Sequence, residues 1–186
     1  MPTHAFADFA VTPLLHENIV KKGFTTPSPI QDQSIPEGLK GHDIIGIANT
    51  GTGKTVAFAV PVLDKLIANP ASSALIMAPT RELALQIQEE CKMLARGSGL
   101  YGAVLIGGAP MGPQLKDLSV KPSIVIGTPG RIKDHMERGS LKLDKFDIVV
   151  LDEVDRMLDM GFVNDMRTIL AELAPVRQSF FFSATM

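Results

Sequence analysis

The chain has 186 residues, the size of one ordinary domain, and 45% of them are hydrophobic, which is enough for a single buried core. The 18 basic and 20 acidic residues nearly cancel, so composition gives no support for a partner held by a large positive field. A single cysteine, Cys91, excludes an internal disulfide framework and a cysteine metal cluster, and we expect it to be buried. Neither a basic, apolar leader nor a run of about 18 apolar residues occurs, so we expect a soluble, cytoplasmic protein without membrane contact.

Short apolar runs alternate with stretches of helical periodicity along the chain. The apolar runs predict strands at 43–48, 74–78, 102–107, 123–128, 147–152 and 179–184. The periodic stretches predict helices at 13–22, 30–39, 54–68, 81–96, 111–118, 130–138 and 162–173. Strands that are apolar throughout are typical of a sheet covered on both faces, with parallel strands joined by crossover helices. The sequence therefore predicts one α/β domain with a mainly parallel sheet and helices on both faces.

The segment after the first predicted strand has the composition of a phosphate-binding loop. Residues 48–55 read ANTGTGKT and lie between a strand and a helix, which is the context that a P-loop requires. Gly51 and Gly53 allow backbone amides to turn inward around phosphates. Lys54 would reach the outer phosphates, and Thr55 would offer its hydroxyl to Mg²⁺. The alternative is a tight turn with an exposed lysine. The alanine at the head of the loop stands where the usual pattern has glycine, and its methyl group fits if φ stays negative.

A P-loop also predicts a carboxylate at the end of a neighbouring strand, and residues 147–155 (DIVVLDEVD) supply it. Asp152 closes the apolar run as the candidate ligand of the metal or its water. Glu153 is a candidate to orient or deprotonate the attacking water. Asp155 has the alternative of a cap on the next helix. The loop and the acidic pair together predict a site for a nucleoside triphosphate with magnesium.

With these residues the chain resembles the amino-terminal, RecA-like domain of the DEAD-box RNA helicases, over essentially its whole length. Residues 23–31 (GFTTPSPIQ) are similar to the Q motif of that family, and 48–55 to its motif I, whose first residue is normally alanine. The resemblance implies that Gln31 hydrogen-bonds the adenine edge and that Phe24 stacks on the ring, with Phe6 as the upstream aromatic. Taken alone, Gln31 has the alternative of an ordinary helix-surface residue. The implied nucleotide-binding residues are Phe24, Thr26, Gln31, Asn49, Thr50, Gly51, Thr52, Gly53, Lys54, Thr55 and Val56.

Three further segments resemble RNA-binding elements of the family. PTRELA (79–84), GG (107–108) and TPGR (128–131) are similar to motif Ia, the paired-glycine element and motif Ib. Each follows a predicted strand, so amides and hydroxyls there can grip a nucleic-acid backbone, largely without regard to base sequence. The two arginines have the alternative of solvated or structural ion pairs. The implied RNA-binding residues are Pro79, Thr80, Arg81, Gly107, Gly108, Thr128, Pro129, Gly130 and Arg131.

DEVD (152–155) takes the place of motif II and departs from it at Val154, where alanine is usual. We expect the two added methyl groups to pack beside the sheet and the acidic roles to survive, while the effect on coupling is left open. The apolar residues of the family-like segment 156–162 are expected in the core. SAT (183–185) matches motif III. The resemblance implies a catalytic set of Lys54, Asp152 and Glu153, a metal set of Thr55 and Asp152, and a coupling set of Asp155, Ser183, Ala184 and Thr185.

The family places its remaining motifs, including arginines that stabilise phosphoryl transfer, in a second RecA-like domain that this sequence lacks. Such arginines contribute about 10³ to 10⁵ in turnover, so we expect this chain to bind ATP, and ADP or AMP as product forms, with little hydrolysis. The resemblance implies the ATP-binding half of an ATP-dependent RNA helicase, with RNA and the second domain as partners and the isolated domain as a monomer. One alternative is a nucleotide-gated module that holds RNA or protein without turnover. Another is a different P-loop enzyme, such as a small-molecule kinase or a DNA translocase.

Overall fold

A single parallel sheet organises the chain in the computed structural model, which describes residues 3–185. Its six strands lie in the order β1-β6-β5-β2-β4-β3, and every neighbouring pair is parallel. The fold class predicted from the sequence is therefore confirmed. The strands are β1 (Ile44–Ile47), β2 (Ala74–Met77), β3 (Gly102–Leu105), β4 (Ile124–Gly127), β5 (Ile148–Leu151) and β6 (Gln178–Ser183).

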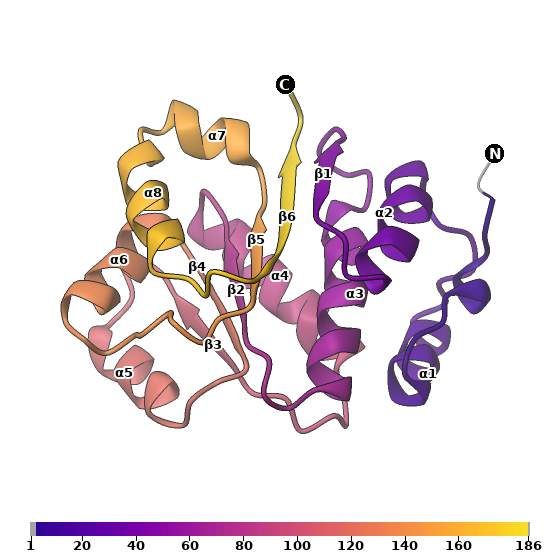
Figure 1. Ribbon diagram of the computed structural model, residues 1–186, viewed down its shortest axis with the longest axis horizontal. Helices are drawn as coiled ribbons and strands as arrows, with labels where there is room; N and C mark the ends of the chain where they lie inside the picture. The colour runs from indigo at the N-terminus through magenta and orange to yellow at the C-terminus, as the bar shows by residue number, and fades with distance from the viewer. Residues whose placement is uncertain (1–2, 186) are drawn as a thin grey trace.

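Helices cover both faces of the sheet, as Figure 1 shows for α2 and α3 on one side and α6 and α8 on the other. They are α1 (Pro13–Lys21), α2 (Pro29–Leu39), α3 (Lys54–Ala68), α4 (Arg81–Leu94), α5 (Met111–Ser119), α6 (Pro129–Glu137), α7 (Val154–Asp159) and α8 (Val163–Ala171), preceded by the short 3₁₀ helix η1 (Phe6–Asp8). Each predicted strand and helix is present, with ends within two residues of the expected ones. No helix within residues 3–185 is both long and apolar enough to cross a membrane.

Alternating side chains of the central strands enter two separate cores. Ile76 of β2 packs with the apolar faces of α1 to α4, whereas its neighbour Leu75 packs with those of α5 to α8. Strands β2, β4 and β5 are buried along their whole length, which explains their uninterrupted apolar sequences. The two cores hold the sheet rigidly between two helical layers, so the loops at its edges have a fixed base.

Helix α7 is the α-helix, and η1 the 3₁₀ helix, that the sequence did not predict. Helix α7 has only six residues and starts directly after the acidic pair, so it offers too little length for an apolar period to be recognised. The expectation that the apolar residues of 156–162 lie in the core is right for Met157, which is fully buried, and wrong for Leu158 and Met160, which are exposed. Val154 packs against the core beside the sheet, as expected.

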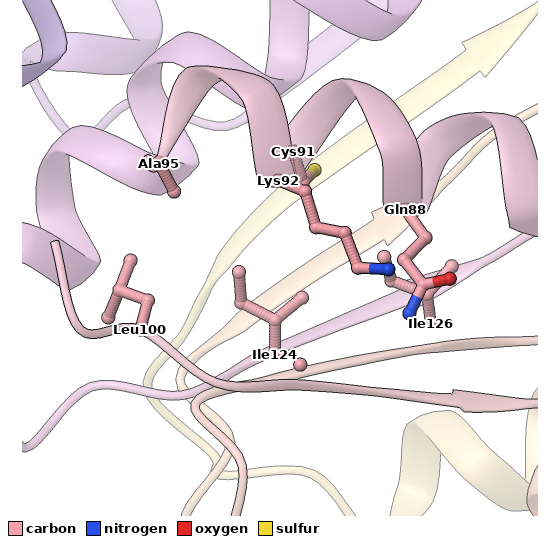
Figure 2. Close-up of a pocket in the computed structure, with 8 residues that line it drawn as sticks. Gln88, Cys91, Lys92, Ala95, Leu100, Ile124 and Ile126 are labelled. Carbon is pink, nitrogen blue, oxygen red and sulfur yellow. The ribbon is translucent and has the colours of Figure 1, made fainter. Parts of the chain in front are cut away.

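A small pocket of about 50 Å³ lies beneath α4, against β3 and β4. Figure 2 shows Cys91 on α4 among the residues that line this pocket. Burial, together with a smaller effect of the nearby Glu90 charge, raises the pKa of the Cys91 thiol to about 12, so the thiol stays protonated and serves as core filling. Gly102, the first residue of β3, also lines the pocket and leaves it unfilled because it has no side chain.

Two strand glycines should therefore respond in opposite ways to an added methyl group. At Gly102 a new Cβ would lie 3.7 Å from the Ile124 carbonyl oxygen, an ordinary contact, so we expect Gly102→Ala to stabilise the fold by about 0.5 to 1 kcal/mol. At Gly127 a new Cβ would collide with the backbone carbonyl oxygen of Leu105, so we expect Gly127→Ala to destabilise it by about 2 kcal/mol or more. Urea unfolding of both variants measures the two changes, and an equal loss of stability would contradict the packing described here.

Candidate functional site

The carboxyl ends of all six strands lie on one edge of the sheet, because all strands run in the same direction. Of the residues expected to act on the nucleotide, 48–56 follow β1, and Asp152 and Glu153 follow β5. The expected coupling residues 183–185 lie at the end of β6, between those two strands, and the three strands form one half of the sheet. Phe24, Thr26 and Gln31 precede β1 in the chain. The residues expected to bind RNA follow β2, β4 and β3, which form the other half. The C label in Figure 1 lies just beyond the end of β6 and so marks this edge.

The loop between β1 and α3 has the backbone of a phosphate cradle. Gly51 and Gly53 have φ angles of 83° and 87°, in the left-handed region that glycine adopts without strain. Gly53 is the N-cap of α3, so the helix presents its free amides to the loop. The φ angle of Ala48 is not positive, which is the condition under which its methyl group was expected to fit at the head of the loop. Of the other loop residues, Asn49 and Thr50 are exposed, Thr55 is half-buried and Val56 is buried.

Lys54 is the first residue of α3, and its side chain turns inward. Only 6% of its surface is exposed, and its ammonium nitrogen has no hydrogen-bond partner among residues 3–185. A buried ammonium without a partner is costly, so this position suits an anion that arrives from outside the protein. The alternative of an exposed turn lysine is wrong.

Asp152, at the end of β5, is 2% exposed. Burial raises the pKa of its carboxyl to about 6, and the charges of Glu153 and Asp155 add to this effect. The charge of Lys54 and a hydrogen bond from the Glu153 amide act in the opposite direction. Lys54 and Asp152 therefore interact electrostatically, although they lie at the ends of two strands that β6 separates.

Glu153 has φ 53°, one of two positive values at described residues other than glycine. Its carboxylate accepts a hydrogen bond from Arg156 Nη1 at 3.2 Å, an arginine that the sequence analysis did not single out. Backbone strain of this kind occurs at functional sites, where the surrounding structure holds it in place. The positions of Asp152 and Glu153 are thus compatible with their expected roles.

The donor set fits a magnesium ion held partly by phosphate. No group of three or more His, Cys, Asp or Glu side chains within the described part of the chain could hold a metal by itself. Mg²⁺ commonly takes one or two protein ligands and completes its shell with phosphate oxygens and water. Thr55 and Asp152 provide an oxygen each at the same edge, next to the orphaned Lys54 ammonium.

Asp155 connects α7 to the residues that follow β6. Its Oδ2 accepts hydrogen bonds from the amides of Ala184 and Thr185, at 3.2 and 3.1 Å, and from the Thr185 hydroxyl at 3.0 Å. Burial alone would raise the pKa of Asp155, but hydrogen bonds from the Arg156 amide, Thr185 and Ser183 outweigh it and lower the pKa. The Ser183 carbonyl in turn accepts from the Ala48 amide at 3.0 Å. The structure thus brings the four residues of the coupling set together and joins them to the P-loop.

Gln31 and Ser28 attach the segment 23–31 to the loop between β1 and α3. Gln31 is 7% exposed, so the alternative of an ordinary surface residue is wrong. Its amide nitrogen donates to the Gly53 carbonyl at 3.1 Å, and its oxygen accepts from the Ser28 amide at 2.9 Å. The Ser28 hydroxyl donates to the Thr52 carbonyl at 2.7 Å. Ser28 was missed by the sequence analysis, although a serine three residues before glutamine and next to proline is the signature of a capping box.

Phe24 stacks on Phe6 rather than standing alone. The ring centroids are 5.2 Å apart with an interplanar angle of 20°, and Phe6 is buried. Phe24 itself is half-buried, and the Lys22 ammonium lies 5.6 Å from its ring centre. Phe6 therefore supports one face of the aromatic residue expected to meet the base, while Thr26 is exposed nearby in the sequence.

The loops after β2, β3 and β4 approach one another. Thr80 is the N-cap of α4, and its hydroxyl accepts a hydrogen bond from the Leu83 amide at 3.3 Å. Arg81 is exposed, and its guanidinium lies against Gly108. A Cβ atom added to Gly108 would be 3.6 Å from Arg81 Nη1. Gly107, Gly108 and Gly130 are exposed, whereas Pro79 and Pro129 are buried and Thr128 is half-buried.

Arg131 has a structural contact of its own. Its side chain is 16% exposed, and Nη1 donates to the Ala109 carbonyl at 3.2 Å. Its Nε lies 3.8 Å from an Asp134 carboxylate oxygen. The alternative of a structural role is therefore supported for Arg131, which connects the start of α6 to the loop after β3 that contains Gly107 and Gly108. No hydrogen bond or ion pair within residues 3–185 supports it for the exposed Arg81.

A buried polar network beneath these loops was not predicted. The Gln114 amide nitrogen donates to the Ile106 carbonyl at 3.1 Å, and its oxygen lies 3.1 Å from His135 Nε2. Because an amide oxygen only accepts, Nε2 carries the proton. The Ser140 hydroxyl oxygen lies 2.8 Å from Nδ1 and 3.0 Å from the His135 carbonyl oxygen, and its one hydrogen can be donated to Nδ1 of a neutral ring. With a neutral imidazole, the side chains of Gln114, His135 and Ser140 all have hydrogen-bond partners. The signal in the sequence was a polar residue at core spacing, since Gln114 lies four residues before Leu118 and His135 three after Ile132.

Comparison with known proteins gives a consistent result. A model of the DEAD/DEAH box helicase family matches residues 28–186. A protein of Listeria monocytogenes serovar 1/2a described as ATP-dependent RNA helicase CshA is 45% identical over 182 residues, 97% of this chain and 35% of the relative. A Limosilactobacillus reuteri protein of the same description is 44% identical over 182 residues, 97% of this chain and 37% of the relative.

Solved structures resemble the whole fold. A DEAD box protein from the hyperthermophile Methanococcus jannaschii superposes with a TM-score of 0.91 at 39% identity, covering 98% of this chain and 50% of that one. A hypothetical ATP-dependent RNA helicase from Sulfolobus tokodaii gives 0.86 at 34% identity, covering 92% and 50%. The chain thus spans little more than a third of these curated relatives and half of these solved chains.

The buried imidazole predicts a pH dependence of stability. Burial lowers the pKa of His135 below 6.5, as do the charges of Arg131 and Arg138, while Asp134 opposes them. As pH falls below about 6.5, the unfolded chain binds a proton that the folded His135 does not, so the free energy of unfolding falls by at most about 1.4 kcal/mol per pH unit. His135→Gln, which keeps a donor toward Gln114, should lack this contribution. Urea unfolding of both proteins between about pH 5 and 7.5 measures the difference, in which the other histidines cancel. Parallel profiles would contradict a neutral buried imidazole.

Proposed function

Because the chain belongs to the DEAD/DEAH box helicase family, we propose that it is the ATP-binding half of an ATP-dependent RNA helicase. In the whole protein this half couples ATP binding and hydrolysis to the clamping of RNA and the local opening of duplexes. The observation that carries the proposal is the buried Lys54 ammonium, which has no hydrogen-bond partner among residues 3–185 and lies in a glycine-rich loop beside a buried Asp152.

The backbone amides of Gly51 to Thr55 and the Lys54 ammonium would bind the phosphates. The amides and the lysine replace water around the outer phosphates, and the phosphates give the ammonium the partner that it lacks. Bound Mg²⁺, held by Thr55 and Asp152, would neutralise phosphate charge. Asp152, with a pKa of about 6, is partly protonated near neutral pH in the free protein, so binding of a cation favours its ionised form.

Glu153 orients or deprotonates the attacking water in this scheme. Its carboxylate has one oxygen bonded to Arg156, which fixes the side chain and leaves the other oxygen available. Asp155 holds the segment after β6 through three hydrogen bonds, so a shift of α7 would be transmitted to Ala184 and Thr185. These residues would report the state of the nucleotide to the second RecA-like domain.

Adenine recognition is assigned to Gln31 and Phe24. With one amide hydrogen on the Gly53 carbonyl and one bond accepted from Ser28, the Gln31 amide retains one donor and one acceptor position. The adenine edge needs one of each. Phe24, supported from behind by Phe6, offers a ring for stacking. The same side chain that reads the base thus holds the loop that binds the phosphates.

RNA binding is assigned to the three loops after β2, β3 and β4. Their helix N-termini and exposed glycines offer backbone amides, and Arg81 offers an exposed charge. Arg131 orders the glycine loop through the Ala109 carbonyl while it retains further donors for a phosphate oxygen. Contacts of this type recognise backbone rather than bases, which fits a chain whose net charge is only −2.

The nucleotide site is tested by Lys54→Met, which removes the ammonium and keeps the length of the side chain. We expect the dissociation constant for fluorescent ADP with Mg²⁺ to rise about 10- to 100-fold, because a charged hydrogen-bonding partner of the phosphates is lost. We expect the variant to be at least as stable as wild type, since an unpaired buried charge disappears.

Lys92→Met is the matched control, because Lys92 is exposed on α4 and its ion pair is with exposed Glu89. Equal affinity of wild type and Lys54→Met for the nucleotide would remove the P-loop from the proposal. Displacement of the probe equally well by guanine nucleotides would remove Gln31 as the adenine reader.

The RNA site is tested in the full-length protein by Arg131→Ala. We expect the RNA concentration for half-maximal stimulation of ATP hydrolysis to rise about tenfold, with the KM for ATP unchanged, because a charged contact at the RNA loops is lost. Arg138→Ala is the control, since Arg138 is the C-cap of the same helix, is exposed and also pairs with Asp134. Equal RNA stimulation of both variants would take Arg131 out of the site, and no hydrolysis in wild type would favour a binding module without turnover.

A further inference from the structure

A second groove lies at the opposite edge of the sheet from the candidate nucleotide site. Its volume is about 630 Å³, and it is formed by the end of α5, the start of β4 and residues 139–146 between α6 and β5. This volume is in the range of sites that hold small molecules or short peptide segments. None of the residues assigned to nucleotide or RNA lines it.

The floor of the groove is apolar. Leu118, Val125, Leu141 and Phe146 line it, and each is less than a tenth exposed. Such a floor gains from contact with an apolar side chain and offers little to a fully hydrated ligand.

The rim of the groove is basic. Lys121, Lys142 and Lys145 line it against a single acidic residue, Asp144, in a chain whose net charge is −2. All three lysines are exposed, and none forms an ion pair with a carboxylate in the part of the chain that the structure describes. The charge of the rim is therefore available to an anionic partner.

Lys121 occupies a position that favours glycine. It follows Val120, the C-cap of α5, and its φ angle is 54°. Among the described residues other than glycine, Lys121 and Glu153 are the two with positive φ. Helices often end with glycine in this left-handed conformation, because a side chain there adds strain. The end of α5 does not by itself explain a lysine here, whereas a charge directed at the groove does.

We propose that this groove binds an acidic peptide segment of a partner protein, in which an apolar side chain is flanked by carboxylates. The apolar side chain covers Leu118, Val125, Leu141 and Phe146, and the carboxylates pair with the three lysines. RNA fits less well. The aromatic ring of the floor, Phe146, is buried and cannot stack on a base, no arginine lines the groove, and phosphates on the lysines would leave the apolar floor uncovered.

The proposal is tested by NMR titration of the ¹⁵N-labelled chain with blocked acidic pentapeptides whose central residue is leucine, isoleucine, methionine or phenylalanine and whose other residues are aspartate and glutamate. We expect saturable shifts at residues 118–125 and 139–146, affinity that weakens with added salt, and loss of binding when the central residue is serine or the flanking residues are lysines. Absence of saturable shifts for all four peptides would overturn the proposal. Equal shifts of the same residues with a uridine oligonucleotide would also overturn it, in favour of RNA.

Lys121→Gly separates a binding role from a structural one, because the two readouts should move in opposite directions. Removal of the strained side chain should raise the melting temperature by about 2 to 4 °C, while peptide affinity falls about threefold. Lys142→Gln should lower affinity by a similar factor without a gain in stability, and Lys92→Gln, distant from the groove, should leave affinity unchanged. If Lys121→Gly and Lys142→Gln bind the peptides as tightly as wild type, the lysine rim has no role and the proposal fails.

Discussion

The common direction of six strands is the constraint on which the rest of the structure depends. Because every strand is parallel to its neighbours, segments that are far apart in the sequence emerge at one edge. The strand order then sorts them, with β1, β6 and β5 on one side and β2, β4 and β3 on the other. β6 lies between the P-loop strand and the strand that ends in the acidic pair, which is why the residues after β6 can contact both. Asp155 reaches them from α7, and the Ala48 amide reaches Ser183 from β1.

The edge also concentrates the unfavourable features of the fold. Lys54 is buried without a hydrogen-bond partner in the described part of the chain, Asp152 is buried with a raised pKa, and Glu153 has a strained backbone. Each lowers the stability of the ligand-free protein, and the two rigid cores on either side of the sheet offset that loss. A ligand that carries phosphate and a cation relieves the first two features together. The affinity that we propose for this site would therefore derive partly from interactions that the free protein cannot make within itself.

The sequence predicted the strands, most of the helices and the edge at which functional residues gather, because buried strands such as 74–77 are apolar throughout and glycine positions such as Gly53 are dictated by backbone geometry. It did not predict contacts between side chains that packing alone brings together. Gln31 on the Gly53 carbonyl, Arg156 on Glu153 and His135 on Gln114 join residues 3 to 22 positions apart, and no periodicity encodes them. Helix α7 was missed for another reason, since six residues are too few to show a pattern. The roles of individual residues toward ATP and RNA came from resemblance, and they stay predictions.

Communication between the two halves of the edge has a physical basis in the backbone. The Asp152 amide donates to the Met77 carbonyl, the Ala78 amide to the Gly127 carbonyl and the Thr128 amide to the Leu105 carbonyl, each at 3.0 Å. These bonds run across the sheet just below the loops and join the acidic pair to all three loops assigned to RNA. Such a ladder resists local distortion, so a change at the nucleotide would move the edge as a unit rather than bend one loop against another. A rigid edge of this kind fits the proposed function, in which ATP and RNA would act by closing a second domain onto this one.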